Sequence, residues 1–133
     1  MPIAAAAGPM TFAQIAERPV VGYHPDNGLG GWLDEAAAQH GVTLTAVTRT
    51  RQASTAAQLA SAGLGVALVP TTALPSSFPG TVRPLAPPLT RDVVALLANP
   101  SDPLAQRFAS DVGRRGVPVP AAIATQLTEA RTR

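Results

Sequence analysis

The sequence predicts an α/β domain of three layers, in which a mostly parallel sheet is flanked by helices. Short apolar or β-branched segments alternate with amphipathic segments in the order strand, helix, strand, helix, strand. That order is typical of parallel sheets with helical crossovers. The segment VALVP (66–70) is apolar at every position, which suits a strand covered by helices on both faces.

The length and composition indicate a single domain and exclude several classes of function. The chain has 133 residues, of which 46% are hydrophobic and 14% charged, enough for a single buried core. Ten basic residues, all of them Arg, exceed eight acidic residues by a formal charge of only +2, so we expect no direct contact with nucleic acid. The sequence contains no Cys, which excludes thiol catalysis and cysteine metal sites. We expect no cofactor and no bound metal.

The N-terminus and the hydropathy indicate a cytoplasmic location without a membrane partner. MPIAAAAGPM (1–10) lacks a positively charged segment, and its apolar run is too short for a signal peptide. No apolar run in the sequence is long enough to span a membrane.

The first predicted elements are a short helix and a buried strand. TFAQIAERP (11–19) is a helix, because Thr11 and Gln14 have the spacing of a capping box and Pro19 stops the helix. PVVGYH (19–24) then has the apolar pattern of a buried strand.

A turn, a longer helix and a second strand follow. PDNGLGG (25–31) is a turn, and the next helix carries an apolar stripe that includes Trp32 and ends near Gly41. VTLTAVTRT (42–50) is rich in β-branched residues and alternates, which favours a strand.

A compact junction lies between the third helix and the third strand. We expect the helix over 54–62, with Thr55 and Gln58 at capping-box spacing. Gly63 can take the left-handed conformation at the helix end, and Gly65 permits close helix–sheet packing. The strand at 66–70 follows at once.

The remaining pattern predicts two further strands at 81–85 and 91–99 and a helix over 101–116. We expect residues 1–116 to form a single domain. Residues 117–133 read as a proline-containing linker and a flexible, at best weakly helical, polar tail.

Three ordered segments of this chain resemble the effector-binding domain of LysR-type transcriptional regulators. The most recognisable is AAQLASAGLGVALVPTTAL (56–74), and GPMTFAQIAERPVVGYHPDNGLGGWLDEAAAQHGV (8–42) and GTVRPLAPPLTRDVVALLANPSDPLAQRFASDV (80–112) extend the likeness on either side. The resemblance is to the second lobe of that domain together with the strand and helix that return to the first lobe. It implies one lobe of a type 2 periplasmic-binding-protein fold, and it leaves the DNA-binding domain and the first lobe without counterparts in this sequence.

The same resemblance implies a small-molecule sensor, and the sheet topology suggests where its effector binds. In open α/β sheets, ligands bind beyond the carboxyl ends of the strands. In YHPDNGLGG (23–31), loop amides lead into a helix N-terminus that suits an anion. The candidate ligand-binding residues in this loop are Tyr23, His24, Asn27 and Gly28. The alternative is a tight turn in which Asn27 only caps the helix.

Two other segments should converge at the same edge. In TRQAST (50–55), Ser54 and Thr55 offer hydroxyls and amides, and Arg51 could neutralise an acidic ligand, although capping and surface pairing explain the same residues. In VPTT (69–72), Pro70 ends the strand and Thr71 presents a hydroxyl, and a simple strand-ending turn is the alternative.

Alternative functions remain beside the sensor. The chain could be a dimerisation or interaction module without its own ligand, since an apolar VVALLA segment without neighbours recruits a partner. Catalysis is not expected, because the only pair suited to hydrolysis is Ser54 with His24 and the G-x-S-x-G motif is absent. A periplasmic solute-binding role shares the fold type but lacks a signal peptide. We therefore expect a homo-oligomer that binds a small-molecule, anionic effector.

Overall fold

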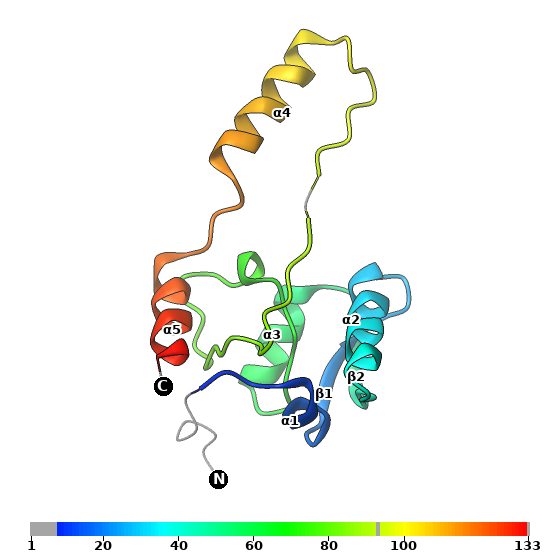
Figure 1. The fold of residues 1–133 in the computed structure, drawn as a ribbon, viewed down its shortest axis with the longest axis vertical. Helices are drawn as coiled ribbons and strands as arrows, with labels where there is room; N and C mark the ends of the chain where they lie inside the picture. The colour runs from blue at the N-terminus through cyan, green and yellow to red at the C-terminus, as the bar shows by residue number, and fades with distance from the viewer. Residues whose placement is uncertain (1–7, 93, 133) are drawn as a thin grey trace.

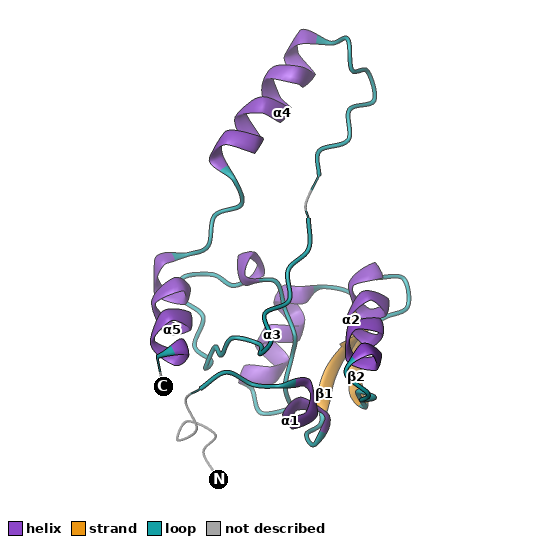
Figure 2. Ribbon diagram, in the orientation of Figure 1, coloured by secondary structure: helices purple, strands orange, loops and turns teal. Residues whose placement is uncertain are grey.

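The computed structural model describes residues 8–92 and 94–132 and confirms the α/β class. Its sheet has two parallel strands, β1 (Val20–Tyr23) and β2 (Ala46–Thr50). Helices α2 (Gly28–Gln39) and α3 (Ala53–Ser61) flank these strands (Figures 1 and 2). The parallel direction predicted from the alternating pattern is therefore correct, whereas the sheet is smaller than expected.

The first helix, α1 (Phe12–Ala16), forms as the local sequence predicts. The Thr11 hydroxyl accepts from the Gln14 amide at 3.2 Å, and the Gln14 side chain accepts from the Thr11 amide at 2.9 Å. This reciprocal capping box satisfies two amides that have no partner within the helix. Phe12 and Ile15 are each only 2% exposed, so the helix anchors the N-terminal segment to the core.

The third strand, predicted over 66–70, is reduced to a single bridge. Val66 lies beside β1, where its amide donates to the Pro19 carbonyl and its carbonyl accepts from the Val21 amide, both at 2.9 Å. Since β2 pairs with the other edge of β1, β1 is central. The ladder does not continue beyond this bridge, and the Leu68 carbonyl accepts from the Tyr23 hydroxyl at 2.7 Å.

The glycines of the junction behave as the sequence suggests. Gly63 follows α3 with φ of 97°, and Gly65 has φ of 155°. A Cβ at Gly65 would overlap the carbonyl group of Pro19, with the carbonyl carbon only 2.9 Å away. Glycine therefore permits a close approach here, and the neighbour it approaches is the backbone at the start of β1.

The predictions of strands at 81–85 and 91–99 are wrong. Leu85 forms only an isolated parallel bridge with Met10, in which the Met10 amide donates to the Pro84 carbonyl at 2.9 Å. Among the described residues of 91–99, none belongs to a strand. An apolar pattern cannot make a strand by itself, because the backbone groups also need an adjacent strand to pair with.

Helix α4 (Pro103–Arg115) is confirmed within the predicted range of 101–116. Asp102 caps it, since its carboxylate accepts from the Leu104 amide at 2.9 Å. Gly116 follows the helix with φ of 65°. The helix and its two connections extend away from the rest of the molecule (Figure 1), and α4 contains no buried residue.

The expectation that the C-terminus is at best weakly helical is wrong for the described residues. Helix α5 (Ala121–Arg131) lies against the body (Figure 1), where Ile123 is fully buried in a cluster with Ala57 and Leu74. The Gln126 side chain also accepts from the Val82 amide at 3.2 Å. Burial of Ile123 supplies the packing that a short helix with few polar contacts needs. The division into a domain over 1–116 and a linker with a tail over 117–133 stays a prediction.

Candidate functional site

The loops that follow β1 and β2 meet at one end of the sheet. The His24 amide donates to the Thr50 carbonyl at 2.9 Å, and the Asn27 side-chain amide donates to the Arg51 carbonyl at 2.9 Å. Because both strands run in the same direction, their carboxyl ends and the N-termini of α2 and α3 lie at the same edge. The structure thus brings together two of the three predicted segments.

Asn27 holds this junction with both ends of its side chain. Its oxygen accepts from the Leu29 amide at 2.9 Å and caps α2, while its nitrogen reaches Arg51 in the neighbouring loop. The capping role considered from the sequence is therefore present. Gly28, the first residue of α2, is exposed, and a Cβ there would meet no atom within 4 Å.

Three charged or titratable side chains gather on the loop surface. Asp26 Oδ2 lies 3.2 Å from His24 Nδ1 and 3.7 Å from Arg51 Nη2. The Asp26 amide donates to His24 Nδ1 at 3.3 Å. Sequence reasoning missed Asp26, although an acidic residue in the turn PDNG was a visible signal.

Tyr23 lies inside the core rather than at the loop surface. Its ring packs with Val21, Leu29 and Leu33, and only 4% of the residue is exposed. The hydroxyl donates to the Leu68 carbonyl. Burial raises the pKa of Tyr23 to about 12, because the ionised phenolate would lose its hydration.

The N-terminus of α3 carries the second predicted segment. The helix begins at Ala53, with Gln52 at the capping position and no side-chain hydrogen bond to cap it. The predicted capping box of Thr55 with Gln58 is therefore wrong, because Thr55 lies within the first helical turn. Ser54 and Thr55 are both exposed beside Arg51.

The third predicted segment lies close to the core around Tyr23 but shows no direct link to the two loops. Leu68 and Val69 pack against the cluster that contains Tyr23 and Ala56. Pro70 then precedes a short 3-10 helix, η2 (Thr71–Ala73). Among the described residues, no hydrogen bond joins Thr71 to the loops after β1 and β2.

A hollow of about 310 Å³ opens beside the junction of the loops. Tyr23, His24, Gly31, Asp34 and Arg49 contribute to its wall. Arg49 donates to the Tyr23 carbonyl at 3.4 Å, so a guanidinium stands at the strand end next to the two loops. The hollow therefore combines apolar strand surface with a few polar groups, the usual make-up of a small-molecule site.

The fold and this loop-built edge define an α/β domain, and a comparison with protein families places it more closely. The sequence model of the LysR substrate binding domain matches residues 1–115, and the chain belongs to this family. The family is regulatory rather than enzymatic, and its members bind small-molecule effectors and typically oligomerise. Searches of the curated proteins and of the solved structures give no match.

Residues 8–92 and 94–132 contain neither a membrane-spanning helix nor a cluster of metal-binding side chains. No helix there has both the length and the apolar character required to cross a membrane. In the same ranges, no three His, Cys, Asp or Glu side chains are grouped so as to hold a metal ion. Among these described residues, the hydrogen bond and the ion pair of the His24 ring are both with Asp26, and neither involves Ser54, its partner in the hydrolytic alternative.

Proposed function

We propose that this chain is the sensor domain of a cytoplasmic LysR-type transcriptional regulator and binds a small anionic effector at the junction of the two loops. The observation that carries this proposal is the first turn of α3, whose amides have no side-chain cap and lie directly after Arg51. Unpaired amides at a helix N-terminus and a guanidinium both favour a negatively charged group. Ser54 and Thr55 add two hydroxyls at the same turn.

The existing partner of Arg51 is weak enough for an effector to replace. Arg51 and Asp26 are 3.7 Å apart, and their side chains are 70% and 72% exposed. An ion pair so well hydrated contributes only about 0–1 kcal/mol. A carboxylate or sulfate that contacts Arg51 and the α3 amides together would compete effectively, because it gains several charge-assisted hydrogen bonds at once.

An effector bound at this site would restrain both loops. Asn27 connects the Arg51 carbonyl to the first turn of α2 through two hydrogen bonds of 2.9 Å. An anion that orders the loop of Arg51 would therefore also restrain the loop of His24. Of the other candidates, His24 and Gly28 lie on the same loop as Asn27, Tyr23 lies in the core behind it, and Pro70 and Thr71 follow the segment that packs against that core.

An NMR titration of the whole chain with sulfate and with a panel of small carboxylates tests this proposal. We expect saturable shifts at the amides of 53–55, and about tenfold weaker binding in Arg51→Gln if one charge-assisted contact of about 1.4 kcal/mol is lost. Arg131→Gln is the matched control, since it removes an exposed arginine in the last turn of α5, outside both loops. Equal binding by wild type and Arg51→Gln would contradict the proposed site.

A second candidate function, a dimerisation module without its own ligand, is favoured by the distribution of exposed apolar side chains. Of the nine large apolar residues that are exposed in the described chain, seven lie between Val94 and Val119. Such a concentration is typical of an interaction surface.

A further inference from the structure

The hollow of about 310 Å³ beside the loops has walls that the proposed anion site does not use, and we call it the sheet hollow. It is lined by β1, by Ala46 and Arg49 of β2, and by the first two turns of α2. Its volume lies near the lower end of the roughly 300–1,000 Å³ of small-molecule sites. The ligand that fits here is therefore a small molecule.

Two side chains of opposite charge line the sheet hollow, Asp34 from α2 and Arg49 from β2. The ion pairs among residues 8–92 and 94–132 involve other carboxylates and other arginines, so Asp34 and Arg49 pair neither with each other nor with a third described residue. Within the same ranges, the Arg49 guanidinium donates only to the Tyr23 carbonyl, at 3.4 Å. Most of its N–H donors and the Asp34 carboxylate can therefore contact a ligand.

The rest of the lining is apolar and leaves space beside Arg49. Leu33 and Leu44 contribute apolar surface to the wall. A Cβ at Gly22 would lie 2.9 Å from the Ala46 Cβ and 3.9 Å from the Arg49 Cγ, and all three residues line the hollow. Glycine at position 22 thus keeps the strand surface beside the Arg49 stem open.

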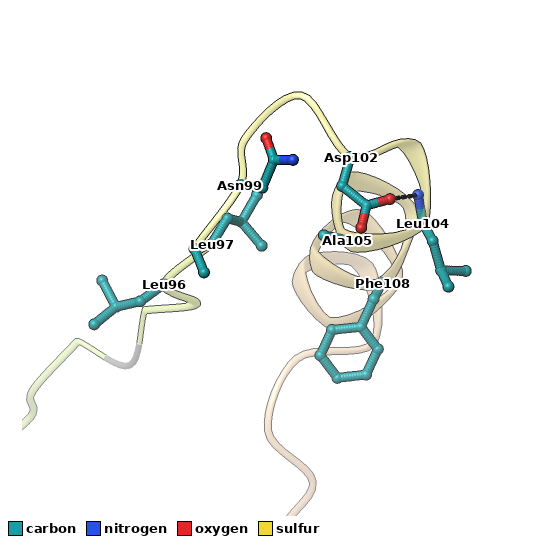
Figure 3. Close-up of a pocket in the computed structure, with 8 residues that line it drawn as sticks. Leu96, Leu97, Asn99, Asp102, Leu104, Ala105 and Phe108 are labelled. Atoms are coloured by element: carbon teal, nitrogen blue, oxygen red, sulfur yellow. Dashed lines mark hydrogen bonds between the residues drawn. The ribbon is translucent and has the colours of Figure 1, made fainter.

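A larger hollow of about 640 Å³ is lined by α4 and the segment before it, but its chemistry differs (Figure 3). Leu96, Leu97 and Phe108 are part of its lining, and Asp102 is the one charged side chain among the described residues that line it. The Asp102 carboxylate already caps α4, since it accepts from the Leu104 amide at 2.9 Å (Figure 3). The two opposite charges therefore distinguish the sheet hollow from the larger one.

We propose that the sheet hollow binds a small zwitterion, whose ammonium group contacts Asp34 and whose carboxylate contacts Arg49, with a short apolar body between them. This site goes beyond the proposed function, because its side chains differ from those of the anion site at Arg51. A polyanion is repelled by Asp34, and a simple amine is repelled by Arg49. A molecule with both charges satisfies both side chains through charge-assisted hydrogen bonds.

NMR titrations of the full chain with leucine and with 6-aminohexanoate, two zwitterions of different charge separation, test the proposal. Each is compared with two analogues that keep one charge: 3-methylbutylamine and 4-methylpentanoate for leucine, and pentylamine and hexanoate for 6-aminohexanoate. We expect at least one zwitterion to shift the amides of Gly22 and Gly31 saturably and to bind at least about tenfold more tightly than its own amine and acid. Binding by neither zwitterion, or equal binding by a singly charged analogue, would overturn the proposal.

Charge variants assign the two ends of the ligand. Asp34→Asn and Arg49→Gln should each weaken binding of the zwitterion about tenfold through the loss of one charge-assisted contact. Glu35→Gln is the matched control, because it removes the next carboxylate of α2, which is exposed and does not line the hollow. Arg51→Gln should also bind normally, which separates this site from the anion site. Full binding in Asp34→Asn and Arg49→Gln together with loss in Arg51→Gln would overturn the proposal and place the zwitterion at the loops.

A substitution at Gly31 tests the location without removing a charge. Gly31 lines the sheet hollow, and a Cβ there would meet no atom within 4 Å, so Gly31→Leu adds a side chain at the hollow without overlap at its Cβ. Gly113→Leu is the matched control, because Gly113 lies on α4 and is equally open. We expect Gly31→Leu to weaken binding at least about tenfold and Gly113→Leu to leave it unchanged. Equal binding by the two variants would overturn the assignment to the sheet hollow.

Discussion

Replacing Gly65 with alanine should destabilise the fold more than the same replacement at Gly63. A Cβ at Gly65 lies 2.9 Å from the Pro19 carbonyl carbon and closer still to its oxygen. These are backbone atoms, so no side-chain rotation relieves the overlap. The same carbonyl accepts the Val66 amide at 2.9 Å, and any shift that makes room for a methyl group weakens the bridge between Val66 and β1.

The size of the effect follows from the backbone conformation and the lost bond. Gly65 has φ of 155°, a conformation that side chains rarely adopt. Such strain costs about 1–3 kcal/mol and the hydrogen bond about 1 kcal/mol, so the free energy of unfolding should fall by about 2–4 kcal/mol. This is a large part of the roughly 5–15 kcal/mol that stabilises an ordinary domain.

The assay is urea denaturation followed by the fluorescence of Trp32, the single Trp of the chain. Gly63→Ala is the matched control, since Gly63 has φ of 97° but an added Cβ would meet no atom within 4 Å. We expect it to cost about 1–2 kcal/mol from conformation alone. Both variants are compared at one protein concentration, because association shifts apparent stability. Equal losses in the two variants would refute the claim that contact with Pro19 is what requires glycine at position 65.

Two further predictions concern the core. The pKa of Tyr23 is raised from 10.0 to about 12, so the unfolded chain releases the phenolic proton first as the pH rises; the stability that this group contributes is complete below about pH 10 and is lost between about pH 10 and 12. Urea titrations at about pH 9 and pH 11 should show this decline in the free energy of unfolding. Tyr23→Phe should remove the decline and should itself cost about 1 kcal/mol, because it leaves the Leu68 carbonyl without its hydroxyl partner. An unchanged decline in the variant would refute the assignment of this pH dependence to Tyr23. Ile123→Ala should lower the free energy of unfolding by about 2–4 kcal/mol, because it opens a cavity beside Ala57 and Leu74, whereas Val117→Ala on the exposed connection should change it by less than about 0.5 kcal/mol. A similar small effect of both substitutions in thermal denaturation would show that α5 does not contribute to the folded core.

The candidate site was predictable where it depends on the direction of the strands. Parallel strands end at a common edge, so the meeting of the loops of His24 and Arg51 follows from the α/β pattern. The directions of the side chains at that edge did not follow from the α/β pattern. The pattern could not show that Tyr23 turns into the core towards Leu68, or that Asp26 stands between His24 and Arg51.

The sequence by itself determined the features that depend on near neighbours in the chain. The capping box of Thr11 with Gln14, the cap at Asn27, the positive φ of Gly63 and the helix over 103–115 all arise from contacts within a few residues. Hydrophobic periodicity likewise located β1 and β2, because alternation is a local property of the chain.

Only the tertiary structure decided which apolar segments became strands and which terminal residues joined the core. The residues around Leu85 have a single bridge to Met10, and the described residues of 91–99 have no adjacent strand, so neither segment forms a ladder. Conversely, 121–131 folds as α5 because distant residues form the pocket for Ile123. A strand needs the backbone of another segment and a marginal helix needs a surface to cover, and both partners lie too far away in the sequence for a local pattern to specify them.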